Sequence, residues 1–259
     1  MFAAEREKKI KEILLQYKHV DINTLCSLLS CSVATVRRDL DKLESEDFLT
    51  KAYGGAIINE IPEQHVFLSG EDDPFLSDKI GAAQIAASII SDNDIIFLGP
   101  GHTCLQIARL LKSQTLSVIT NSISIANELS GCHAINLILL GGDVTADPNG
   151  GIYTSGQNAI RMMSNLFVEK AFFSVNAVSV KYGFTLNNMP VMDVLKVAMK
   201  QSGETYVVAD SSKFGKRSMV KLADLTDIPN IITNVEINSE YKEFCFKNKI
   251  RLFTSFDEK

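Results

Sequence analysis

Apolar residues recur at helical spacing in three runs near the start of the chain, and each run predicts a short helix. The first helix is expected over about Ala4–Tyr17, and the second after Asp21, whose side chain is a good N-cap. The third is expected after Ser32, another N-cap residue that only Ser30 and Cys31 separate from the second helix. The residues expected to face the core are Ile10, Ile13, Leu14, Tyr17, Leu25, Leu28, Leu29, Val33, Val36, Leu40 and Leu43. Two helices joined by so tight a turn are typical of a helix-turn-helix.

The segment that follows these helices predicts a β-hairpin wing. Phe48–Tyr53 is extended in pattern, and Gly54–Ala56 would close the hairpin. In helix-turn-helix proteins the first turns of the second helix enter the major groove, where arginines and hydroxyls reach base edges and phosphates. The residues expected at a DNA surface are Ser32, Thr35, Arg37, Arg38, Lys42, Lys51 and Tyr53.

The same cations have a simpler interpretation. Arg37, Arg38 and Lys42 would form a solvated helix face if neighbouring carboxylates paired with them across helical turns. The carboxylates at suitable spacing are Asp39, Asp41 and Glu44. The tight turn, the hydroxyl-rich helix start and the glycine-closed wing together favour DNA binding.

Beyond about residue 77 the pattern changes to short apolar runs that alternate with helical ones. This alternation predicts a mostly parallel sheet covered by helices on both faces. Helices are expected from Lys79–Ile90 and Thr103–Leu111 onward. The expected strands are Ile95–Leu98, Leu116–Thr120, Asn136–Leu140, Lys170–Val175, Thr205–Ala209, Asn230–Ile232 and Arg251–Thr254.

Polar and glycine-rich segments follow several of these strands. Ligands of open parallel sheets bind at the carboxyl ends of the strands, so these segments predict a pocket there. Each segment alone is more simply explained as a turn or a helix cap, whereas four at one sheet edge favour a pocket. The residues expected to line it are Gly101, His102, Thr103, Thr120, Asn121, Gly141, Gly142 and Lys213.

Composition narrows the class of protein without naming it. The net charge is −5, and residues 1–56 contain as many basic as acidic residues, so charge alone does not suggest nucleic-acid binding. The five cysteines are scattered without a CxxC pair, which favours reduced thiols in a cytoplasm. Neither a signal peptide nor a membrane segment is expected. We find no metal-ligand spacing and no nucleophile-base pair, so no cofactor, metal or catalytic residue is expected.

The stretch SVATVRRDLDKLESEDFLTKAYGGA, which starts at Ser32, resembles the helix-turn-helix of the DeoR family. The shared features are a hydroxyl-rich helix start, Arg37–Leu40 and the wing-closing Gly54–Ala56. One departure is Asp47, where many members have glycine before the wing.

The region from about Lys79 to Asn234 resembles the DeoR C-terminal domain, most closely at Thr120–Asn121, Gly141–Gly142 and Asp210–Gly215. This resemblance implies a fold similar to ribose-5-phosphate isomerase and glucosamine-6-phosphate deaminase. It also implies a cytoplasmic regulator, usually a repressor of a sugar or nucleoside operon, whose effector is commonly a phosphorylated sugar.

The departures from the family pattern lie mostly in the expected pocket. Gly99, Pro100 and His102 replace an aspartate and two hydroxyl residues, and Thr145 stands where many members have arginine. Asn176–Ala177 also differs from the family pattern, and Asp193 is expected to replace an acidic residue of the family's site. Backbone amides, Thr103 and Lys213 can still form a phosphate site. The alternatives are an unusual effector or a vestigial pocket.

The expected domains are a winged helix-turn-helix over residues 1–57, a linker over 58–77 and an α/β sensing and oligomerisation domain over 78–259. The expected partners are double-stranded operator DNA, a small-molecule effector such as a sugar phosphate, and further copies of the chain. Two other classes stay open. One is a sugar-phosphate enzyme using Asp143, Asp193 and Lys213, and the other is a domain that only oligomerises.

Overall fold

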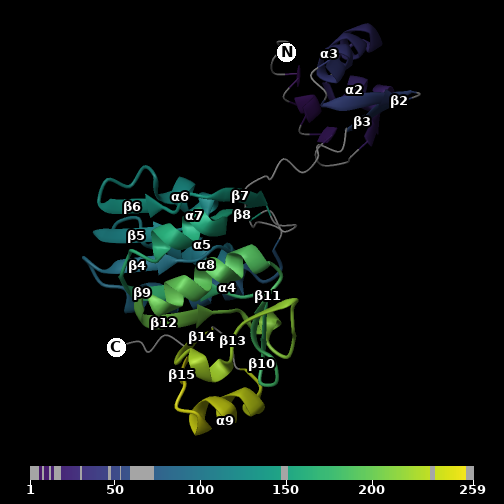
Figure 1. Ribbon diagram of the computed structural model, residues 1–259. Coiled ribbons are helices and arrows are strands. Elements are labelled where there is room, and N and C mark those ends of the chain that lie inside the picture. Colours follow the sequence, from purple (N-terminus) through teal and green to yellow (C-terminus); the bar gives the residue numbers. More distant parts are fainter. Residues whose placement is uncertain are drawn as a thin grey trace. The chain divides into compact units, whose positions relative to one another are not determined.

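The computed structural model describes most of the chain and divides it into two compact units, Met1–Gln64 and His65–Lys259 (Figure 1). The described residues are 6, 7, 9–11, 13, 14, 19–29, 31–45, 48–52, 54–58, 73–146, 151–233 and 237–254. Among these residues no helix is long and apolar enough to cross a membrane.

The smaller unit is a helix-turn-helix with a three-stranded antiparallel wing. Its first helix is represented by the described helical residues between 6 and 14. The strands occur in the order β1-β3-β2, with both pairings antiparallel. The elements are β1 (His19–Asp21), α2 (Ile22–Leu29), α3 (Val33–Ser45), β2 (Leu49–Ala52) and β3 (Gly55–Ile58). The predicted second and third helices and the hairpin wing are therefore confirmed.

Most residues predicted for the core of this unit are buried, but two predictions are wrong. The fully or almost fully buried residues are Ile10, Leu14, Leu25, Leu29, Val36, Leu40 and Leu43. Leu28 is 56% exposed, because the short helix α2 is packed on one side only, and Val33 is 38% exposed at the projecting first turn of α3. Tyr17 lies outside the described residues.

Both predicted N-caps make their hydrogen bonds. The Asp21 carboxylate accepts hydrogen bonds from the backbone N–H groups of Asn23 and Thr24, at 3.0 and 2.9 Å, and from the Thr24 hydroxyl. The Thr24 hydroxyl bond is the main cause of the lowered pKa of Asp21. Ser32 Oγ accepts from the Thr35 N–H at 3.3 Å. The two helices are thus capped on either side of the turn.

The larger unit contains a seven-stranded sheet in which every neighbouring pair of strands is parallel. The strand order is β15-β14-β12-β9-β4-β5-β6. The strands are β4 (Ile95–Leu98), β5 (Leu116–Thr120), β6 (Ile135–Leu139), β9 (Val168–Ser174), β12 (Ser202–Val208), β14 (Asn230–Ile232) and β15 (Arg251–Phe253). All seven predicted strands are present, with ends displaced by at most a few residues, so the predicted fold class is confirmed.

Helices and two small sheets complete this unit (Figure 1). The helices are α4 (Leu76–Ile89), α5 (His102–Leu110), α6 (Ile123–Leu129), α7 (Gly156–Met163), α8 (Met189–Lys200) and α9 (Ser239–Lys247), with 3₁₀ turns at Ser211–Lys213 and Leu225–Asp227. The small sheets comprise the hairpin β7 (Asp143–Ala146) and β8 (Ile152–Ser155), and β10 (Ala177–Ser179), β11 (Gly183–Leu186) and β13 (Val220–Ala223). The strands of these small sheets were not predicted from the sequence.

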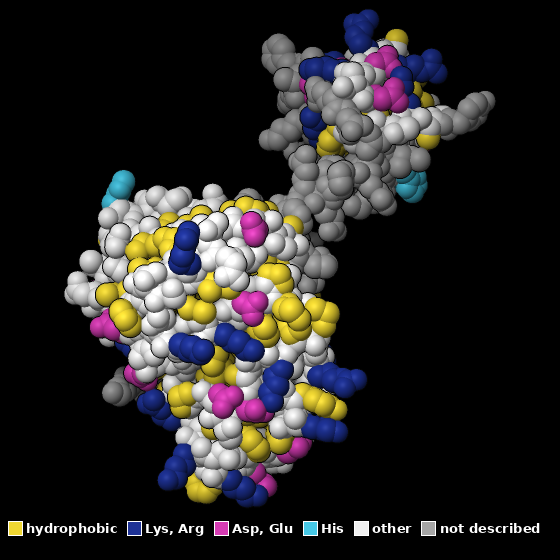
Figure 2. All heavy atoms as spheres, in the orientation of Figure 1, with side chains coloured by type: hydrophobic (Ala, Val, Ile, Leu, Met, Phe, Trp, Pro, Cys, Tyr) yellow, Lys and Arg dark blue, Asp and Glu magenta, His cyan; other side chains and the backbone are white. Residues whose placement is uncertain are grey.

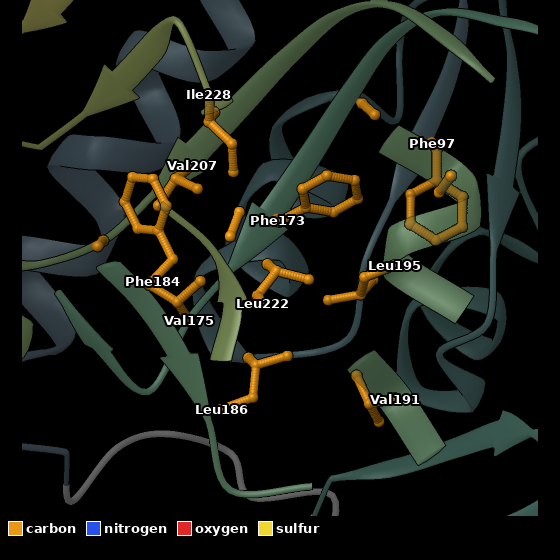
Figure 3. Close-up of a cluster of buried hydrophobic side chains, with 14 of the residues drawn as sticks. Phe97, Phe173, Val175, Phe184, Leu186, Val191, Leu195, Val207, Leu222 and Ile228 are labelled. Carbon is orange, nitrogen blue, oxygen red and sulfur yellow. The ribbon is translucent and has the colours of Figure 1, made fainter. Parts of the chain in front are cut away.

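Consecutive residues of the central strands point into different cores. Phe172 stacks on Tyr206 in the core formed with α4, α5 and α6, at a ring distance of 4.9 Å. Phe173 meets Phe97 in the opposite core, at 5.8 Å, together with Leu195 of α8 (Figure 3). Because both faces of the sheet are covered, the strands have apolar rather than alternating sequences.

The strand order places one switch point in the sheet. The chain builds β4, β5 and β6 outward in one direction and then returns to add β9 on the other side of β4. The loops after β4 and β9 therefore leave the sheet in opposite directions, and the ends of these two strands are where an open α/β sheet binds ligands.

Candidate nucleic-acid interface and effector site

The first turn of α3 presents hydroxyls and cations on a firmly held backbone. Ser32 C=O accepts hydrogen bonds from the N–H groups of Thr35 and Val36, both at 3.0 Å. The Ser32 and Thr35 hydroxyls are 2.9 Å apart. Arg37 and Arg38 follow one turn later with exposed side chains. This arrangement suits insertion of the helix start into a major groove.

The carboxylates of α3 are engaged by residues other than these arginines. Asp39 is buried and binds Arg6 through two hydrogen bonds of 2.8 and 3.1 Å. Lys51 Nζ lies 2.6 Å from Asp41 and 2.9 Å from Glu44. The bond to Asp41 is the main cause of the raised pKa of Lys51. These acidic side chains therefore anchor the first helix and the wing to α3.

Arg37 and Arg38 consequently have no carboxylate partner within the described part of the chain. Lys42 differs, because its ammonium group lies 2.8 Å from both oxygens of Glu7. Lys42 and Lys51 would have to exchange these ion pairs for phosphates on binding DNA. Tyr53 lies outside the described residues.

Replacing Asp39 with asparagine should lower the melting temperature of the smaller unit by about 5 °C or more. The variant loses the charge that holds the buried side chain to Arg6. Asp41→Asn is the matched control, because it breaks an exposed ion pair of α3, and such pairs contribute little. Thermal unfolding followed by circular dichroism tests this, and equal melting temperatures for both variants would exclude an anchoring role for Asp39.

In the larger unit, the loop after β4 lies against the end of β9 at the switch point. Gly99 N–H donates to the Phe172 carbonyl at 2.9 Å. Gly101 has a φ of 129°, and a Cβ there would lie 2.8 Å from Cβ of Ser174. Helix α5 begins at His102, and its N-cap residue, Gly101, has no side chain that could cap the first amides. This loop can present backbone N–H groups to an anion.

The predicted residues after β5 are buried and bonded to the main chain. Thr120 Oγ1 donates to the Leu98 carbonyl at 2.7 Å, and Asn121 Nδ2 donates to the Thr154 carbonyl at 2.9 Å. Both side chains are fully buried. Asn121 Oδ1 has no hydrogen-bond partner among the described residues. Thr120 and Asn121 thus join β4, β5 and β8 at the carboxyl edge.

Gly141 and Gly142 line a groove of about 510 Å³ next to α7. Arg161 and Met162 of α7 form another part of its wall. Arg161 was not predicted from the sequence, because nothing in the pattern of α7 separates it from an ordinary surface arginine.

The two remaining predicted residues lie on separate elements. Lys213 is half-buried at the end of the turn that follows β12, where buried Asp210 accepts a 3.0 Å hydrogen bond from Ser212 N–H. Asp193 is exposed on α8. Neither Lys213 nor Asp193 lines the groove beside Gly141 and Gly142.

One ion pair at this edge was missed by the sequence reasoning. Lys79, near the start of α4, is 7% exposed and pairs with Asp73. Burial opposes ionisation of Asp73, but the hydrogen bond from Lys79 lowers its pKa, and His102 contributes in the same direction. His102 therefore lies close enough to this pair to interact with it electrostatically. Asp73 falls in the stretch read from sequence as a linker.

The remaining groups of chemical interest in the larger unit are its buried thiol and its candidate metal ligands. Cys104, in the first turn of α5, is fully buried, and desolvation raises its pKa to about 12. A thiol in this state is not a nucleophile at neutral pH. The described residues contain no group of three or more His, Cys, Asp or Glu side chains able to hold a metal ion.

Comparison with known proteins agrees with this two-unit architecture. The family model for the DeoR C terminal sensor domain matches residues 76–235, and that for the DeoR-like helix-turn-helix domain matches residues 6–61. The ribose 5-phosphate isomerase A of Methanocaldococcus jannaschii is 19% identical, with 52% of this chain and 53% of that chain covered. Its TM-score of 0.39 is too low to support a functional argument.

Full-length relatives agree with the family models. The transcriptional repressor GlcR of Bacillus subtilis is 29% identical, over 98% of this chain and 97% of that protein. The lactose phosphotransferase system repressor of Staphylococcus epidermidis is 30% identical, over 89% of this chain and 91% of that protein. The chain therefore belongs to the DeoR family, and it is a DNA-binding transcriptional regulator with a C-terminal sensor domain.

Proposed function

We propose that this protein is a repressor of a sugar-related operon that binds its operator as a homo-oligomer through the first turns of α3. The observation that carries the DNA contact is the pair of exposed arginines, Arg37 and Arg38, beside carboxylates that are all engaged elsewhere. Paired recognition helices at helical-turn spacing read operators efficiently, which supports an oligomer. A relative named as a lactose phosphotransferase system repressor supports the link to sugars.

The effector is proposed to be a small anionic metabolite, with sugar phosphates as the first candidates. The start of α5, whose N-cap is Gly101, offers backbone amides, and half-buried Lys213 offers a cation at the same sheet edge. The other residues predicted for this sheet edge are His102, Thr103, Thr120, Asn121, Gly141, Gly142 and Asp193. Gly141 and Gly142 line the groove beside α7, which neither Lys213 nor Asp193 lines. The buried Thr120 and Asn121 would act by shaping the site rather than by exposed contact.

The experiment that tests this function is a fluorescence-anisotropy titration of the protein against DNA from upstream of its own operon. Scrambled DNA is the reference, several salt concentrations are used, and a panel of sugar phosphates is then added. Binding much tighter than to scrambled DNA, relieved by one compound, supports both proposals. Specific binding that no compound changes argues for a vestigial pocket in a domain that only oligomerises.

Lys213→Ala should raise the effector concentration needed for half-maximal release of DNA by about tenfold or more. The reason is the loss of a charge-assisted hydrogen bond to the anion. Operator affinity without effector should be unchanged. Lys216→Ala is the matched control, because it removes an exposed lysine three residues away. A full response in the Lys213 variant would remove this residue from the site.

We infer that the sensor domain binds its ligand without transforming it. An isomerase needs a general base held against the substrate carbon. Asp143 and Asp193 are both exposed, and Cys104 is inert. Turnover of any sugar phosphate in the panel would contradict the binding-only role.

A regulator of operon DNA acts where the chromosome is, so we also infer a cytoplasmic protein.

A further inference from the structure

A second hollow, of about 460 Å³, lies on the small sheet formed by β10, β11 and β13. Its wall contains Lys181, Arg217 and Lys221, the ring of Tyr182 and the side chain of Met219. In Figure 2, Lys and Arg side chains gather over this small sheet at the lower right of the larger unit. None of the residues proposed for the effector site lines this hollow.

Two of the cations share one aromatic ring. Lys181 Nζ and Arg217 Cζ each lie 5.2 Å from the centroid of the Tyr182 ring. The two positive charges are therefore at most about 10 Å apart, roughly one Debye length at 0.1 M salt. Attraction to the ring holds each cation in place, but their mutual repulsion is not fully screened.

The repulsion between Lys181 and Arg217 is not relieved by a nearby carboxylate among the described residues. The third cation of the hollow, Lys221, does have such a partner, because it pairs with Asp224 at 2.5 Å. Lys181 and Arg217 form no ion pair with any carboxylate in the described ranges of the chain. A concentrated positive charge without a counter-ion in a concave surface attracts anions.

The backbone next to Arg217 is held by β11. Ser218 N–H donates to Thr185 Oγ1 at 2.8 Å, and the Ser218 hydroxyl bonds to Asn187. Thr185 is itself buried, at 4% exposure. Arg217 is thus presented from a fixed main chain, which lowers the entropy lost when a ligand binds.

We propose that this hollow is a second anion site, which takes the phosphate group of a small phosphate ester between Lys181 and Arg217. A phosphate ester carries about −1.5 to −2 charges at neutral pH, which matches two cations. The arginine fork suits two phosphate oxygens, while lysine acts as a point charge. Met219, 71% exposed, and the Tyr182 ring offer apolar surface to the organic part.

Isothermal titration calorimetry of the full-length protein without DNA tests this site. The probes are inorganic phosphate, glucose 6-phosphate and glucose, each at low and at high salt. The variant Lys181→Ala/Arg217→Ala should weaken phosphate binding at this site at least tenfold. The matched control, Lys200→Ala/Lys247→Ala, likewise removes two exposed positive charges from the larger unit and should bind as the unmodified protein does.

The outcomes separate this site from the proposed effector site. A binding event that persists in Lys213→Ala and is lost in Lys181→Ala/Arg217→Ala supports the proposal. In that case, equal affinity for both phosphates assigns recognition to the phosphate group, and preference for glucose 6-phosphate adds a contribution from the organic part. Equal binding of glucose, no phosphate binding at all, or unchanged binding in the double variant would each overturn it. Because DNA is absent, failure of the operator assay does not affect this result.

Discussion

Replacing Arg37 and Arg38 together with alanine is expected to weaken specific operator binding by at least about 100-fold. The two guanidinium groups are exposed at the start of α3, and the carboxylates of this helix are engaged by Arg6 and Lys51. No intramolecular ion pair in the described part of the chain is broken by their removal. Anisotropy titration against operator and scrambled DNA gives the loss of affinity directly, and circular dichroism shows whether the fold is kept.

The salt dependence of the same titration shows what the arginines contact. Loss of a phosphate contact lowers the slope of log affinity against log salt by about one per contact, whereas loss of a base contact lowers the preference over scrambled DNA. Lys200→Ala/Lys247→Ala, in the larger unit, is the matched control for charge. Operator affinity that is the same in the arginine variant and in this control would contradict the placement of the recognition helix.

Gly55→Ala is expected to destabilise the smaller unit by about 2–3 kcal/mol and to abolish operator binding at physiological temperature. A Cβ at Gly55 would lie 2.3 Å from the Val20 carbonyl oxygen and 2.9 Å from Asp21 Cα, both backbone atoms. Strands β1 and β3 pair at this point, and Asp21 also caps α2. The methyl group must therefore push apart the strand pair that attaches the wing to the helices.

The adjacent glycine is the matched control for this substitution. Gly54 has a φ of 85°, but a Cβ there has open space around it. Gly54→Ala should thus cost only the backbone strain, about 1 kcal/mol. Chemical unfolding of the smaller unit within the full chain, followed by circular dichroism, gives both values. If Gly55→Ala were no more destabilising than Gly54→Ala, the close contact between β1 and β3 would not exist in solution.

In the DNA-binding unit, local sequence was enough to predict the second and third helices, the wing hairpin and the caps, but not strand β1. Asp21 and Ser32 act only on the amides that follow them, so no distant contact was needed to recognise them. Helical spacing did not predict the exposure of Leu28 and Val33, since that depends on which neighbours a short helix has. The roles of the acidic residues were also hidden. Asp39 reaches Arg6 from 33 residues away in the chain.

In the sensor unit, the sequence determined the α/β class, all seven parallel strands and the family, because buried strands have continuous apolar runs and the motifs are local. Only the tertiary structure decided the strand order, which places the switch point between β4 and β9. It also brought Lys79 and Asp73 beside His102, buried Thr120 and Asn121, and placed Lys181 and Arg217 on one ring. These relations join residues far apart in the chain, and a sequence pattern records spacing along the chain but not proximity in space.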